Sequence, residues 1–154
     1  MLASKFTIWG IQCPALQHPL SPGPLRMSES AKILLIEDDE SLRKNLAYGL
    51  RKADYVVMAL PDGSDALDKV GEFCPDLVVT DIIMPQKEGI GLILELHKMA
   101  PLIPVIAISG GGQIPVDELL GYAKAFGVQR SLAKPFRIRE LTDAVAEVLA
   151  ELKG

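Results

Sequence analysis

Apolar and polar residues follow two alternating patterns from residue 33 onward. Short runs of apolar, β-favouring residues predict five strands, at residues 33–36, 55–60, 76–81, 104–108 and 130–133. Apolar residues at helical spacing predict five helices, one opening at 62–64 and the others at 41–53, 89–99, 116–126 and 138–152. Because the strands are almost continuously apolar, both faces of their sheet must be covered. The pattern therefore predicts an α/β fold, a doubly wound five-stranded parallel sheet with five helices.

The first 26 residues differ from this pattern. They contain four prolines, no acidic residue and two basic residues, Lys5 and Arg26. Met27 then opens a segment that is a natural start for a compact domain. We assign residues 1–30 to a disordered N-terminal extension or a mis-called start codon, and residues 31–154 to a single folded domain. The short apolar stretch at 6–11 has no clear cleavage site after it, so a targeting role is not favoured.

Composition narrows the class of protein. A formal net charge of −4 over 154 residues provides no electrostatic footprint for nucleic acid. No stretch approaches the roughly 18 uninterrupted apolar residues of a membrane span. Cys13 and Cys74 lie far apart, show no metal or disulfide spacing, and fit a reducing, cytoplasmic setting in which Cys74 is inert packing. We expect a cytoplasmic protein with neither a nucleic-acid nor a membrane partner.

Polar side chains stand where four predicted strands end. Glu37 and Asp38 follow the first strand, Asp81 ends the third, and Ser109 and Lys134 follow the last two. These ends meet at one edge of a parallel sheet, where such folds bind ligands. Crowded carboxylates repel one another, and Mg²⁺ removes that penalty beside a phosphoryl group. Asp81 is the candidate nucleophile for that group, although a strand-ending aspartate also serves simply to cap a turn.

Four motifs carry a resemblance to a known family. They are the run 33–40 with its acidic end, the run 78–85 around Asp81, the segment 107–110, and Lys134 with the two residues that follow it. In this order, with helix-length gaps, they resemble the receiver domain of two-component response regulators over about residues 31–152. The resemblance implies a flavodoxin-like, CheY-like fold. It also implies that Asp81 is the phosphoacceptor for a sensor histidine kinase or a histidine phosphotransfer protein.

The same resemblance assigns roles around Asp81. Asp38 would bind Mg²⁺ directly and Glu37 through water, with Asp81 and the backbone carbonyl of Ile83 as further ligands. The remaining roles belong to later residues: Ser109 would donate to the phosphoryl group, Lys134 would pair with it, and Pro135 would follow a cis peptide bond. Asp39 and Glu40 lie outside the acidic pair and are expected to be first-turn helix charges.

Two positions depart from the family pattern. Ser131 stands where the family usually has an aromatic residue, three positions before the motif lysine. The loop after Ser109 is rich in glycine and contains Pro115. Both departures lie on the signalling face, so we expect the phosphorylation chemistry to be kept and the usual aromatic switch to be absent.

The sequence favours a stand-alone response regulator that signals to a downstream target by protein contact, with no DNA-binding output segment. A phosphorelay intermediate or a phosphate sink remains the alternative. A flavodoxin-like cofactor binder fits less well, because the acidic run at 37–40 would repel a phosphate unless a metal intervened. A haloacid-dehalogenase-like phosphatase would need Asp-x-Asp at the first strand, and a degenerate scaffold would lack competent groups. We expect no enzyme activity beyond Mg²⁺-dependent self-phosphorylation and autodephosphorylation.

Overall fold

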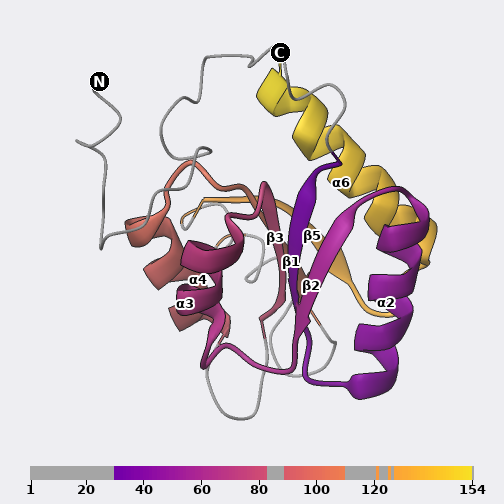
Figure 1. The fold of residues 1–154 in the computed structure, drawn as a ribbon, viewed down its shortest axis with the longest axis horizontal. Helices are drawn as coiled ribbons and strands as arrows, with labels where there is room; N and C mark the ends of the chain where they lie inside the picture. Colours follow the sequence, from indigo (N-terminus) through magenta and orange to yellow (C-terminus); the bar gives the residue numbers. More distant parts are fainter. Residues whose placement is uncertain (1–29, 83–88, 110–120, 122–124, 126, 154) are drawn as a thin grey trace.

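The computed structural model describes residues 30–82, 89–109, 121, 125 and 127–153. Five parallel strands form one sheet in the order β2-β1-β3-β4-β5. Helices α2 and α6 cover one face of this sheet, and helices α3 and α4 cover the other (Figure 1). The molecule therefore has three layers, with the sheet in the middle.

The described elements alternate between strand and helix as the sequence predicts, except that β5 directly follows β4 because the helix expected between them lies almost wholly outside the described residues. They are β1 (Lys32–Ile36), α2 (Glu40–Lys52), β2 (Val56–Leu60), α3 (Ala66–Phe73), β3 (Leu77–Asp81), α4 (Gly89–Met99), β4 (Val105–Ser109), β5 (Val128–Ala133) and α6 (Ile138–Lys153). The fold class is confirmed, and the strand order is that of doubly wound flavodoxin-like sheets. The predicted helix at 116–126 and the N-terminal extension lie almost wholly outside the described residues.

The core has two halves, one on each face of the sheet. Successive side chains of a strand point to opposite faces, and β1 shows this directly: Leu34 and Ile36 pack under α3 and α4, whereas Ile33 and Leu35 pack under α2 and α6. Every residue of β3 is buried. This double burial is the physical reason for the continuous apolar runs in the sequence.

Helix α2 starts immediately after the acidic run. The side chain of Asp39 accepts a hydrogen bond from the backbone N–H of Leu42 at 2.9 Å and caps the helix. Glu40 lies in the first turn, where a negative charge interacts favourably with the helix dipole. The expectation of a first-turn charge is confirmed for Glu40, whereas Asp39 stands one residue earlier as the N-cap. The start of α2 is thereby held close to the end of β1.

Two details, at β5 and at Cys74, differ from the sequence prediction. Strand β5 begins at Val128 rather than Arg130, because a register shift between Val105 and Ile106 of β4 accommodates the extra residue. Cys74 ends α3 in a left-handed conformation and is bonded in a disulfide, so the expectation drawn from the absence of disulfide spacing is wrong. Cys13 lies outside the described residues. Within the described ranges, no helix is both long and apolar enough to cross a membrane.

Candidate functional site

The acidic residues meet where β1 and β3 end side by side. Ile36 of β1 is in register with Thr80 of β3, so Glu37 and Asp81, the next residue of each chain segment, come abreast. Strand β2 lies on the other side of β1, and β4 lies on the other side of β3. From β1 the next strand along the chain lies on one side, and from β3 the next strand lies on the other side. Doubly wound folds bind their ligands at this switch in strand order.

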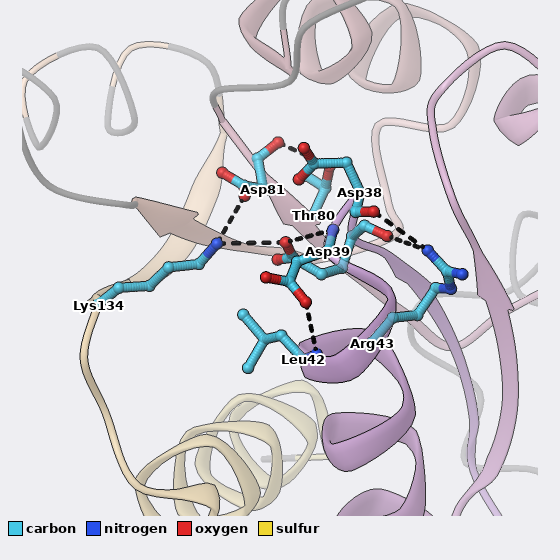
Figure 2. A network of polar contacts seen from close by, with 8 residues as sticks. Asp38, Asp39, Leu42, Arg43, Thr80, Asp81 and Lys134 are labelled. Carbon is cyan, nitrogen blue, oxygen red and sulfur yellow. Dashed lines mark hydrogen bonds and ion pairs between the residues drawn. The ribbon is translucent and has the colours of Figure 1, made fainter.

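Glu37 and Asp81 are buried carboxylates that share one cation. Their relative exposures are 0% and 2%. The Nζ atom of Lys134 donates to Asp81 Oδ2 at 2.8 Å and to Glu37 Oε1 at 3.2 Å (Figure 2). Charge pairing of this kind is what makes two buried carboxylates tolerable in a protein interior.

Lys134 reaches the two carboxylates from the end of β5, an edge strand of the sheet. It directly follows β5, and the peptide bond to Pro135 is cis, as the sequence resemblance implied. The lysine side chain is 24% exposed, so its charged end is partly covered and partly open to solvent. The site thus combines residues that lie 97 and 53 positions apart from Lys134 in the sequence.

Burial and charge together shift the pKa values of this group. Burial, and then repulsion by Asp81, raise the pKa of Glu37 to about 7, although Lys134 partly opposes this shift. Burial lowers the pKa of Lys134, but the hydrogen bond and the charge of Asp81 outweigh burial and raise it overall. Lys134 therefore stays protonated, whereas Glu37 changes its charge near neutral pH in the absence of a metal.

The carboxylates also suit a divalent cation. One oxygen each from Glu37, Asp38 and Asp81 lie within 4.8 Å of one another, and Asp38 is exposed while the other two are buried. Glu37 Oε2 is buried and has no hydrogen-bond partner among the described residues. A buried carboxylate oxygen without a partner is costly, and a cation or its bound water would satisfy it. The donor set, which is all oxygen and open to solvent on one side, fits Mg²⁺.

The structure brings together four of the predicted site residues: Glu37, Asp38, Asp81 and Lys134. Ile83 lies outside the described residues. Ser109 is the last residue of β4, and its backbone therefore ends one strand away from Asp81. The roles assigned to these residues remain predictions.

Three contacts of the site were not predicted from sequence. The Thr80 hydroxyl donates to the backbone carbonyl of Asp81 at 3.1 Å. The backbone N–H of Asp39 donates to Glu37 Oε1 at 3.3 Å. Arg43 Nη1 donates to the carbonyl of Glu37 at 2.8 Å. An arginine one helical turn after an acidic run is the sequence signal for the last contact, since its fork of donors readily reaches nearby oxygens.

A family model described as the response regulator receiver domain matches residues 33–146. The chain belongs to this family.

Among curated proteins, it is 31% identical over 118 residues to the alkaline phosphatase synthesis transcriptional regulatory protein PhoP of Bacillus subtilis, covering 77% of this chain and 48% of that protein. It is 32% identical over 131 residues to the sensor kinase CckA of Brucella abortus, covering 80% of this chain and 13% of that protein. The chain thus spans about half the length of the first of these relatives, and far less of the second.

Solved structures support the same assignment. The chemotaxis protein CheY4 of Vibrio cholerae superposes with a TM-score of 0.70 at 26% identity, covering 77% of this chain and 98% of that one. A receiver domain protein from Clostridium thermocellum superposes with a TM-score of 0.72 at 28% identity, covering 80% and 97%. Residues 33–146 therefore form a receiver domain of a two-component response regulator.

Proposed function

We propose that this receiver accepts a phosphoryl group on Asp81 from a sensor histidine kinase or a histidine phosphotransfer protein. The observation that carries the proposal is the environment of Asp81. Its carboxylate is buried at the end of the central strand, holds the ammonium of Lys134, and lies beside two further carboxylates. Such a cluster suits a group that brings negative oxygens together with a cation.

The chemistry follows from these contacts. A carboxylate oxygen of Asp81 forms a bond to phosphorus while the bond between phosphorus and the donor's histidine nitrogen breaks, and the electron pair of that bond stays on the imidazole. Lys134 already lies 2.8 Å from Asp81, so its charge is in place to pair with the added phosphoryl oxygens. When bound by Glu37, Asp38 and Asp81, Mg²⁺ would offset the negative charge of those oxygens. Ser109 and the backbone carbonyl of Ile83 are proposed to complete the site.

The phosphorylated state is proposed to act through protein contacts. The relatives include proteins named as transcriptional regulators and a sensor kinase. This chain matches only part of each, and its net charge of −4 does not favour DNA. We favour a cytoplasmic response regulator with a protein target. A relay intermediate or phosphate sink is the alternative, and no catalysis beyond self-phosphorylation and autodephosphorylation is proposed.

The test is labelling by a small acyl phosphate, followed by intact mass measurement with Mg²⁺ or with EDTA. We expect one phosphoryl group per chain with Mg²⁺ and none with EDTA. Asp81→Asn retains the shape of the side chain but removes the nucleophile, so labelling should be lost. Asp68→Asn, which changes an exposed carboxylate on α3, is the matched control and should label normally.

Normal labelling of the Asp81→Asn protein would overturn the assignment of the phosphoacceptor. Equal labelling with Mg²⁺ and with EDTA would overturn the role of the cation. Phosphotransfer profiling against purified histidine kinases would then identify the donor, and a kinase that transfers to wild type but not to Asp81→Asn would qualify.

A further inference from the structure

Residues 37–39, which we call the acidic loop, connect β1 to α2. Arg43 contacts this loop from the side opposite to Lys134 (Figure 2). Its Nη1 atom donates to the backbone carbonyl of Glu37 at 2.8 Å and approaches the carbonyl of Asp38 at 3.5 Å. These are the two loop residues that offer carboxylates to the candidate cation site. The guanidinium therefore touches the backbone that carries the ligands, and not the ligands themselves.

The position of Arg43 in the first turns of helix α2 explains how this contact restrains the acidic loop. The backbone N–H of Arg43 donates to the carbonyl of Asp39 at 2.8 Å, which is the first helical hydrogen bond of α2. The carbonyls of Glu37 and Asp38 precede this bond, so the helix ladder does not restrain them. The side chain of Arg43 extends the restraint of the helix backwards by two residues, onto the end of β1.

Other contacts restrain the same loop less directly. The backbone N–H of Glu37 donates to the carbonyl of Leu60 at 3.1 Å, which anchors the loop to β2. The N–H of Asp39 donates to the Glu37 carboxylate at 3.3 Å, a long hydrogen bond. Arg43 forms the shortest contact of the three and is charged, so its hydrogen bond is the strongest restraint.

We propose that Arg43 is a positioning residue, which fixes the peptide planes of Glu37 and Asp38 so that both carboxylates face a divalent cation beside Asp81. This inference rests on the proposed function, because it assumes that the three carboxylates bind a cation. It assigns to Arg43 a role in cation affinity that acts through the backbone.

The proposal predicts an effect opposite in sign to that of simple electrostatics. A positive charge near a cation site repels the cation, so removing Arg43 would tighten Mg²⁺ binding if only its charge mattered. If Arg43 positions the ligands, its removal weakens binding instead. Loss of a group that orients metal ligands typically costs about 10- to 100-fold in affinity.

The experiment compares Arg43→Met with Arg51→Met. Arg51 is also on α2, and it also donates to a backbone carbonyl, that of Val57 at 3.1 Å, but near the opposite end of the helix. Both variants remove one positive charge and a guanidinium donor to the backbone. By titration calorimetry we expect Mg²⁺ affinity to fall about tenfold in Arg43→Met and to stay near the wild-type value in Arg51→Met.

A second readout needs no cation. In the metal-free protein, amide hydrogen exchange of Asp39 and Leu42 should be faster in Arg43→Met than in wild type, because their hydrogen bonds lie in the loop that Arg43 restrains. Arg43→Lys keeps the charge but loses the fork of donors. It should show weakened Mg²⁺ binding as well, and it serves as the test variant if Arg43→Met does not fold.

The outcomes separate the inference from the function on which it rests. If wild type does not bind Mg²⁺, the proposed cation site is wrong. If wild type binds Mg²⁺ and the Arg43 variants bind it equally or more tightly, the positioning role is wrong and the proposed function stands. Weaker binding in Arg51→Met to the same degree would also overturn the inference, since the effect would then be a general one on α2.

Discussion

Glu37 has a side chain with no exposed surface, one oxygen on Lys134, and a second oxygen with no partner among the described residues. Its pKa of about 7 follows from burial and from the neighbouring Asp81. At the residue scale, the candidate site is therefore a cluster of buried carboxylates that repel one another. A proton on Glu37 or a bound divalent cation reduces this repulsion.

The raised pKa predicts how stability depends on pH in the metal-free protein. Folded Glu37 keeps its proton up to about pH 7, whereas the unfolded chain releases it near 4.5. Between these values the folded state binds more protons, so the free energy of unfolding falls as pH rises, by up to about 3 kcal/mol. Urea denaturation in EDTA across this pH window measures the slope. Glu37→Gln should remove this contribution to the slope, and Glu72→Gln, exposed on α3, should retain it.

Lys134 predicts a second effect, on metal affinity. It holds oxygens of Glu37 and Asp81 that a cation would also use. Lys134→Met should therefore bind Mg²⁺ several-fold more tightly, while the metal-free protein loses about 3 kcal/mol because two buried carboxylates lose their counterion. Titration calorimetry and urea denaturation measure the two effects. Lys44→Met, in an exposed pair with Glu40, is the control. Weaker Mg²⁺ binding in Lys134→Met would show that the lysine organises the site rather than competing for it.

At the scale of elements, α2 connects the site to the rest of the fold. Its first turn caps on Asp39 and holds the acidic loop through Arg43, and its inner face packs on the sheet through Leu46 and Leu50. The same helix also lies against α6. At this contact, a Cβ added to Gly49 would lie 2.3 Å from Ile138 Cγ2.

Gly49→Ala should therefore destabilise the protein, by about 1–3 kcal/mol. An alanine at an interior helix position normally gains up to about 1 kcal/mol over glycine, but here the clash with a branched side chain outweighs that gain. Gly91→Ala on α4 is the matched control, because a Cβ there meets nothing within 4 Å and should stabilise the protein. Urea denaturation compares the two. Equal stabilisation by both substitutions would contradict the close approach of α2 and α6.

At the scale of the whole molecule, both halves of the core are built from residues between 33 and 148 in the part of the chain that the structure describes. Residues 1–26 have the composition of a linker, and they lie outside the described residues. Removing them should leave the rate of labelling by a small acyl phosphate unchanged, because the carboxylates and the lysine of the candidate site all lie after residue 36. A clear fall in that rate would show that the segment contributes to the site.

The sequence by itself determined the fold class and the identity of the acids. Continuous apolar runs require a sheet buried on both faces, and strand ends in a parallel sheet share an edge. These two rules were sufficient to predict that the side chains of Glu37, Asp38, Asp81 and Lys134 lie close together. Strand boundaries were predicted to within one or two residues, and the largest error, at the start of β5, came from a register shift that no local pattern records.

The tertiary structure decided the interactions inside the site. Lys134 bridges two carboxylates that lie 97 and 53 residues away, and the raised pKa of Glu37 depends on what surrounds it. The hydrogen bond from Arg43 to the backbone of the acidic loop depends on where α2 starts relative to β1. Sequence periodicity reports which face of an element is buried. Distances between side chains, and hence their charges and affinities, are set only when the elements pack.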